Sequence, residues 1–145
     1  MPNKPQALLL IPILIFLDWA TKTLASNVDI ELIPNFFYLA ASKNPGVIFG
    51  FFPKNIFITI LLPILLILIL AFYFKKESSK FSITGLAFII SGLLGNLLDR
   101  ILYGHVIDFI YFKIIPKYSI SLFNLADSYV VIGLILIIYA TFRNK

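Results

Sequence analysis

The residues of this chain that are best suited to chemistry are aspartates in apolar surroundings. An ionisable side chain inside a membrane costs at least about 2.5–3.5 kcal/mol, so it usually faces a protein interior and has a function. Four of the seven acidic residues lie in or beside apolar segments, namely Asp18, Asp99, Asp108 and Asp127. All four are expected at the outer ends of their segments. The remaining acids are interpreted as solvated loop charges: Asp29, Glu31 and Glu77.

Asp108 and Asp127 are the candidate catalytic pair. Asp108 is flanked by hydrophobic residues in the stretch 104–110, and Asp127 lies near the start of the last apolar segment. Two carboxyl groups that are brought close together share one proton, because both cannot ionise cheaply. One can then accept a proton from water while the other donates a proton to a scissile amide. No serine or cysteine nucleophile and no metal is needed for this chemistry.

Amide and cationic side chains lie at helical spacing around these acids. Asn124 is three residues before Asp127, and Asn96 is four residues before Arg100, so each pair shares a helix face. An amide beside a guanidinium can hold peptide carbonyls at the membrane edge. The alternative is an interfacial anchor in which Arg100 snorkels and Asp99 pairs with it. Asp127 could likewise be a carboxylate that favours the start of a helix.

Composition indicates that a membrane must position these residues. Of the 145 residues, 60% are hydrophobic and 13% are charged, whereas soluble domains are about 45–50% apolar and about 25% charged. A soluble enzyme and an intrinsically disordered chain are therefore both excluded. The absence of cysteine removes disulfides and thiolate chemistry, and the single histidine, His105, makes a zinc protease improbable. We expect no metal and no cofactor.

The apolar runs predict an all-α integral membrane protein that forms a single domain over residues 1–145. Its four transmembrane helices are expected at about 7–25, 56–74, 81–98 and 122–142. The outer loop 26–55 is predicted to form short strands and turns. The stretch 101–121 is too interrupted for a span and is expected to lie at the bilayer interface. The first run is interpreted as an uncleaved span rather than a signal peptide, because Asp18 and Lys22 suit a cleavage region poorly.

Basic residues predict the orientation. With four spans, each side of the membrane receives six of the twelve Lys and Arg residues. The six on the side of the termini are concentrated in far less loop sequence, which places both termini in the cytoplasm. The net charge of +5 is interpreted as loop lysines that face anionic lipid, and no nucleic acid partner is expected.

Five sequence blocks resemble the lipoprotein signal peptidases, also called signal peptidase II. They occur in the order and spacing of that family and span nearly the whole chain. The blocks are Asp18-Trp19-Ala20-Thr21-Lys22, Asn44-Pro45-Gly46, Gly95-Asn96-Leu97-Leu98-Asp99-Arg100, Val106-Ile107-Asp108-Phe109 and Phe123-Asn124-Leu125-Ala126-Asp127-Ser128. The last three blocks are specific, whereas the first two are weak by themselves.

This resemblance implies an aspartic endopeptidase of the bacterial inner membrane with a small extracytoplasmic β-cradle, here within residues 26–55. The family removes signal peptides from diacylglyceryl-modified prolipoproteins and cuts just before the lipidated cysteine. Its catalytic dyad falls on Asp108 and Asp127. Its substrate-contacting positions fall on Asn44, Gly46, Asn96, Arg100 and Asn124. Supporting roles fall on Asp18, Lys22 and Asp99. Lipidated substrates and membrane lipid are the expected partners, with no obligate protein partner.

The chain departs from the family pattern at two places. Val47-Ile48 stands where the family often has two alanines, and Trp19 stands where glutamine often follows the first aspartate. Neither change affects the dyad. A small ion-coupled transporter is the leading alternative function, since intramembrane aspartates suit proton relays. A transporter should place its acids near the bilayer midplane, however, and not at the outer ends of its helices. A non-catalytic membrane assembly protein is the third possibility.

Overall fold

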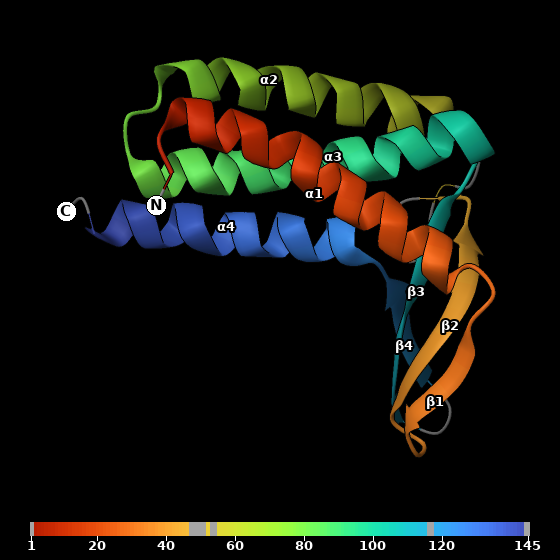
Figure 1. The fold of residues 1–145 in the computed structure, drawn as a ribbon. Coiled ribbons are helices and arrows are strands. Elements are labelled where there is room, and N and C mark those ends of the chain that lie inside the picture. Colours follow the sequence, from red (N-terminus) through yellow and green to blue (C-terminus); the bar gives the residue numbers. More distant parts are fainter. Residues whose placement is uncertain (1, 47–51, 53–54, 116–117, 144–145) are drawn as a thin grey trace.

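The computed structural model describes residues 2–46, 52, 55–115 and 118–143, of which 114, 115 and 118–122 are described by their backbone alone. The elements alternate between long helices and short strands (Figure 1). In chain order they are α1 (Lys4–Ala25), β1 (Asp29–Ile33), β2 (Phe37–Asn44), the π-helical turn η1 (Phe57–Leu61), α2 (Leu62–Lys76), α3 (Lys80–Tyr103), β3 (Val106–Ile115), β4 (Tyr118–Phe123) and α4 (Leu125–Arg143).

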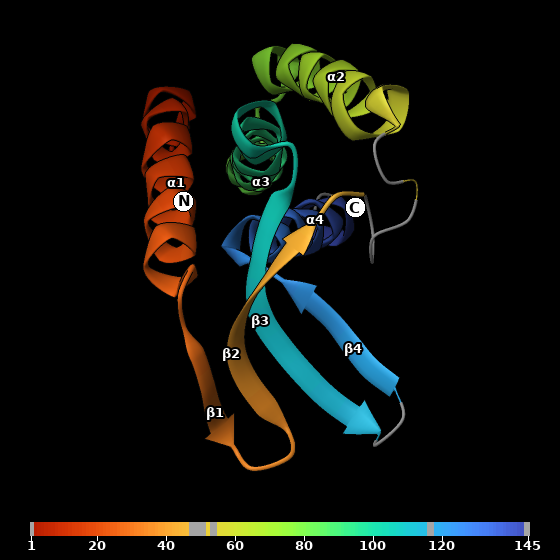
Figure 2. The same cartoon turned by 90° about the vertical axis from the view of Figure 1, so that its right-hand side faces the viewer.

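Within the described part of the chain, four helical segments are long and apolar enough to cross a membrane: α1, η1 with α2, α3 and α4. This confirms the predicted four-helix membrane protein. The helices lie side by side, and the sheet projects from one end of the bundle (Figure 1). Helix α3 is the central one, since 67% of its most apolar window is buried, against 17–22% for the other three. Figure 2 shows α3 surrounded by α1, α2 and α4.

Helices α1 and α3 extend beyond their predicted spans where the local sequence caps them, whereas α4 begins at Leu125 and not at residue 122, because β4 continues to Phe123. Asn3 and Gln6 form a capping box at the start of α1, so the helix begins at Lys4 and not near residue 7. Helix α3 continues past residue 98 to Tyr103 and ends at Gly104, whose φ of 74° suits a left-handed C-cap. The charged residues near this end do not stop the helix: Asp99 pairs with Lys22, and Nη2 of Arg100 donates to the Gly46 carbonyl.

The second span begins with a π-helical turn directly before Pro63. Proline lacks the backbone N–H that an α-helix needs and its ring crowds the carbonyl four residues earlier. A wider turn is one way in which a helix accommodates such a residue. The side chain of Thr59 in this turn is buried and donates a hydrogen bond to the Asn55 carbonyl at 2.8 Å.

Among the residues that the structure describes, the sheet has four antiparallel strands in the order β1-β2-β3-β4. Aromatic pairs stabilise the pairing of β2 with β3: Phe37 stacks on Phe112 with ring centroids 4.7 Å apart, and Tyr38 lies 5.3 Å from Tyr111. The register shifts once between these strands, between Leu39 and Ser42 of β2. Ser42 then lies opposite Asp108, so the irregularity adjoins a candidate catalytic residue.

The cradle expected within 26–55 accounts for only β1 and β2. The stretch 101–121, expected at the bilayer interface, contains the last turn of α3, the whole of β3 and most of β4. Its strands were not predicted, because β3 carries apolar residues on both faces and lacks the alternation that reveals a half-buried strand. The hairpin leads from the end of α3 to the start of α4 (Figure 2), and it thereby places Asp108 beside the helix that carries Asp127.

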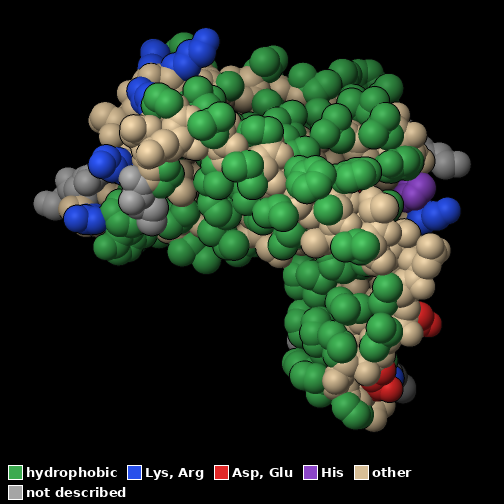
Figure 3. All heavy atoms as spheres, viewed as in Figure 1, with side chains coloured by type: hydrophobic (Ala, Val, Ile, Leu, Met, Phe, Trp, Pro, Cys, Tyr) green, Lys and Arg blue, Asp and Glu red, His purple; other side chains and the backbone are tan. Residues whose placement is uncertain are grey.

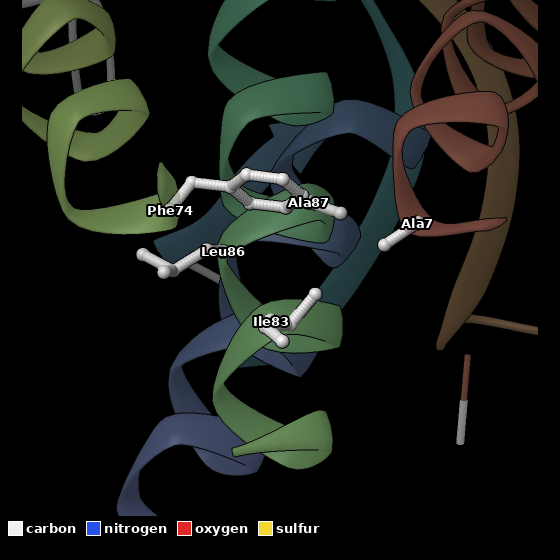
Figure 4. Packing of buried hydrophobic residues seen from close by; sticks show 5 residues of the cluster. All are labelled: Ala7, Phe74, Ile83, Leu86 and Ala87. Atoms are coloured by element: carbon white, nitrogen blue, oxygen red, sulfur yellow. The ribbon is translucent and has the colours of Figure 1, made fainter. Parts of the chain in front are cut away.

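A compact apolar cluster holds the helices together at the end away from the sheet. Ala7 of α1 and Phe74 of α2 are buried against the side of α3 (Figure 4). The α3 members of this cluster are Ile83, Leu86 and Ala87. On the face shown in Figure 3, hydrophobic side chains cover most of the helical bundle, as a lipid-facing surface requires.

Two glycines of α3 allow the neighbouring helices to approach closely. A Cβ at Gly92 would collide with the backbone oxygen of Ala126 in the first turn of α4. A Cβ at Gly95 would lie 2.6 Å from a carboxylate oxygen of Asp18 on α1. The missing side chains therefore let three helices meet at one level of the bundle, the level at which the polar residues gather.

Candidate active site

The candidate dyad is connected through one buried asparagine. Asn124 has no exposed surface, and its Nδ2 donates to Oδ1 of Asp108 at 2.7 Å. Its backbone N–H donates to Oδ2 of Asp127 at 3.2 Å. Asp108 is 2% exposed on β3, whereas Asp127 is half-buried in the first turn of α4. The fold thus brings together the carboxylates of residues 108 and 127, which are 19 residues apart in the sequence.

Asn124 also caps helix α4. Its Oδ1 accepts a hydrogen bond from the backbone N–H of Asp127 at 3.0 Å, while Asp127 accepts from the backbone N–H of Asn124. This reciprocal arrangement is a capping box with aspartate in the third helical position. It explains why α4 begins at Leu125, and it fixes the carboxylate of Asp127 against the helix terminus.

Asn44 holds the other side of Asp108. Its Nδ2 donates to Oδ2 of Asp108 at 2.9 Å, so each carboxylate oxygen of Asp108 accepts one amide hydrogen bond. The Oδ1 of Asn44 accepts from the backbone N–H of Gly46 at 3.1 Å, which closes the turn expected from Asn44-Pro45-Gly46. Gly46 in turn accepts a hydrogen bond from Nη2 of Arg100 at 2.9 Å.

Asn96 joins the dyad to a cluster of buried charges. Its Nδ2 donates to Oδ1 of Asp127 at 2.7 Å, and its Oδ1 accepts from Nδ2 of Asn124 at 3.0 Å. The same oxygen accepts from the ammonium group of Lys22 at 3.0 Å. All five residues expected to contact substrate, Asn44, Gly46, Asn96, Arg100 and Asn124, therefore belong to one hydrogen-bonded network with the two aspartates.

Lys22 lies between two aspartates. It forms the expected i, i+4 ion pair with Asp18 at 2.7 Å and a second ion pair with Asp99 at 2.8 Å. The interpretation in which Asp99 pairs with Arg100 is wrong, because Asp99 points to Lys22 and to the backbone N–H of Ile107, and Arg100 points to Gly46. Asp18 also accepts from the backbone N–H of Ala126 at 2.9 Å, which ties α1 to the start of α4.

Burial and neighbouring charge set the electrostatics of Asp108. Burial raises the pKa of this carboxyl from 3.8 to about 6. The hydrogen bond from Asn44 opposes the rise, and the nearby charge of Asp127 adds to it. A carboxyl whose pKa is close to neutral can hold or release a proton during a reaction. Two neighbouring carboxyls of this kind are able to supply the acid and base functions that amide hydrolysis needs.

The chain also matches known proteins. The family model described as signal peptidase II matches residues 10–143. The chain belongs to the signal peptidase II family. It is accordingly a membrane peptidase, and the comparisons give no support to an ion-coupled transporter or a non-catalytic assembly protein.

Relatives match this peptidase over most of their length. It is 40% identical to a lipoprotein signal peptidase of Clostridium novyi over 121 residues, which are 82% of each chain. It is also 40% identical to a lipoprotein signal peptidase of Clostridium tetani over 122 residues, 83% of this chain and 78% of that protein. A solved bacterial membrane enzyme has a similar fold, with a TM-score of 0.84 and 28% identity over 97% of this chain and 89% of its own.

Some contributors to the site could not be identified from side-chain motifs. The backbone N–H groups of Ala126 and Ile107, which donate to Asp18 and Asp99, have no signature in the sequence. Glycines are one sequence signal for close helix contact, and Gly92, Gly95, Gly85 and Gly133 all lie where a Cβ would meet a neighbouring helix. His105 is half-buried, with its ring 6.3 Å from that of Tyr103. The substituted pair Val47-Ile48 lies outside the described residues.

Proposed function

We propose that this peptidase removes signal peptides from diacylglyceryl-modified prolipoproteins and cuts immediately before the lipidated cysteine. The relatives named above are lipoprotein signal peptidases, and the site described here contains the groups that such a reaction requires. The observation that carries the proposal is the sharing of Asn124 by the carboxylates of Asp108 and Asp127.

In the proposed mechanism Asp108 and Asp127 share one proton. The ionised carboxyl takes a proton from water as the water oxygen attacks the carbonyl carbon of the scissile amide. The protonated carboxyl then gives its proton to the amide nitrogen, and the C–N bond breaks. The products are the carboxyl end of the signal peptide and a new amino group on the lipidated cysteine. No cofactor takes part in these steps.

Polar residues around the dyad are proposed to hold the substrate backbone. Arg100 is suited to this role because its Nε is buried and has no hydrogen-bond partner among the described residues. Such a donor is costly to leave unpaired, and a peptide carbonyl would satisfy it. Asn44 and Gly46 lie beside Arg100 and Asp108, whereas Asn96 and Asn124 hold the dyad from the helix side.

The proposed location is the bacterial inner membrane, with both termini in the cytoplasm. Both termini and the loop between α2 and α3 lie at the end of the bundle opposite the sheet (Figure 1), where Lys and Arg side chains gather (Figure 3). Lys4 there donates to the backbone carbonyl of Lys75 at 2.7 Å. Cytoplasmic loops are enriched in basic residues. The sheet and the dyad would then lie at the extracytoplasmic face.

Cleavage of a defined substrate tests this proposal. The purified protein is incubated with a diacylated prolipoprotein peptide, and the products are identified by mass spectrometry. We expect one cut, directly before the lipidated cysteine. Absence of cleavage, or a cut elsewhere, would contradict the proposed function.

A further inference from the structure

Lys22 is a buried cation whose contacts lead to the candidate dyad. Its side chain is 1% exposed, so water does not compete for its protons. The ammonium group has three N–H donors, and the structure provides three acceptors within 3.0 Å. They are Oδ2 of Asp18 at 2.7 Å, Oδ2 of Asp99 at 2.8 Å and Oδ1 of Asn96 at 3.0 Å.

The third contact determines which way the amide of Asn96 points. Its oxygen accepts from Lys22 and also from Nδ2 of Asn124, so the amide NH₂ group must face Asp127. If the amide turned over, its NH₂ group would face a buried ammonium group and the oxygen would face a carboxylate. Both contacts would be repulsive, and an unpaired buried cation is strongly unfavourable.

A cation on the amide oxygen also strengthens the donor at the other end of the amide. Hydrogen bonds in a chain polarise one another when the surroundings are shielded from water. The chain here runs from Lys22 on α1 through Asn96 on α3 to Asp127 on α4, with the last bond at 2.7 Å. The same cation lies close enough to lower the pKa of Asp108, against the burial that raises it.

We propose that Lys22 is a positioning residue for the peptidase reaction, acting through Asn96 to fix and strengthen the hydrogen bond that orients Asp127. The inference rests on the proposed function of Asp127 in hydrolysis. It assigns to Lys22 more than the ion pairs that join α1 to α3. A purely structural lysine would support the bundle equally well without its contact to Asn96.

The test replaces the cation without leaving two buried carboxylates unpaired. Lys22→Met is combined with Asp99→Asn, so that the cluster of Asp18, Lys22 and Asp99 keeps the net charge that it has in the wild type. The double variant is compared with Asp99→Asn alone. Cleavage of a diacylated prolipoprotein peptide is measured at matched amounts of folded protein. Misorientation of a catalytic group should lower kcat at least about tenfold and leave KM within about twofold.

A double-mutant cycle separates action through Asn96 from a general structural effect. In an Asn96→Ala background, the same Lys22→Met change should lower kcat by less than about threefold further, because the group that transmits its effect is absent. A loss that multiplies with that of Asn96→Ala would contradict the proposal. So would a kcat within about threefold of the Asp99→Asn reference when Asn96 is present.

Folding is controlled with a second substitution, Lys22→Gln with Asp99→Asn. It should show the same loss of kcat, because the neutral amide lacks the charge that polarises Asn96. If both Lys22 variants are unfolded where Asp99→Asn is folded, Lys22 serves bundle stability and the proposal is wrong.

A readout without substrate keeps this inference distinct from the proposed function. The side-chain NH₂ signals of Asn96 in ¹⁵N spectra should shift and lose exchange protection in the Lys22 variants and not in Asp99→Asn. If these signals shift as expected but the wild type cleaves no substrate, the proposed function is refuted and the role of Lys22 in orienting Asn96 is not. Unchanged signals would refute the role of Lys22.

Discussion

Replacing Asp108 with asparagine should lower turnover by about 10²–10⁴ and, at the same time, remove the loss of stability that the wild type undergoes as the pH rises through about 6. Asparagine keeps the shape of the side chain but cannot exchange a proton. If Asp108 is the acid or the base of the reaction, the rate should fall by about 10²–10⁴. Of the two amides that donate to Asp108, those of Asn44 and Asn124, one can still donate to the remaining carbonyl oxygen, whereas the other faces the new NH₂ group.

The stability effect follows from the raised pKa of Asp108. Burial raises this pKa from 3.8 to about 6, so between these values the folded protein holds a proton that the unfolded chain has released. The resulting stabilisation is complete below about pH 4 and is lost as the pH rises through about 6. A shift of roughly two pKa units corresponds to about 3 kcal/mol. Asparagine does not titrate and does not lose this contribution.

We therefore expect the Tm of Asp108→Asn minus the Tm of the wild type to increase by several degrees when the pH is raised from 4 to 8. Thermal unfolding in detergent across this pH range measures the difference, and cleavage of a lipidated prolipoprotein at matched protein level measures the rate. Asp29→Asn, at an exposed position on β1, is the matched control and should change neither quantity.

Asp127→Asn should also lose activity. The double mutant should be little worse than either single one, because residues that act as a unit are not additive.

Two results would refute this reasoning. Retention of more than about a tenth of the wild-type rate by Asp108→Asn would show that this carboxyl is neither the acid nor the base. A Tm difference that stays constant with pH would show that Asp108 does not carry the raised pKa assigned to it.

Three further outcomes are expected. Chelators should leave activity intact, since the proposed chemistry uses two carboxyls in a chain with no cysteine and one histidine; a loss in EDTA that zinc restores would overturn the aspartic mechanism. A substrate peptide without its lipid should be cleaved much more slowly, because binding of the acyl chains helps to position the scissile amide, and equal rates would contradict this. Gly92→Ala should lower the Tm, because the added Cβ meets the backbone oxygen of Ala126. Such overpacking should lower the free energy of unfolding by about 1–3 kcal/mol, and an unchanged melting curve would show that α3 and α4 can separate freely.

Local interactions made several features predictable from the sequence alone. Long apolar runs require helices in a membrane, because only internal hydrogen bonds can satisfy the backbone there. Asp18 and Lys22 are four residues apart, so their ion pair follows from the helix repeat. The spacing of Asn124 and Asp127 indicated one helix face near the start of the last span, but the structure was needed to show that α4 begins at Leu125, so that Asn124 caps it.

The tertiary structure decided how these local units combine. Nothing in the apolar sequence of β3 showed that it pairs with β2, yet this pairing carries Asp108 to Asn44 and to the start of α4. The pairing of Asp99 with Lys22 instead of Arg100 depends on how closely α1 packs against α3. Such contacts join distant segments, and backbone N–H groups supply part of them. Residue spacing encodes neighbours along one helix, whereas the meeting of two carboxylates from a strand and a helix depends on the packing of the whole bundle.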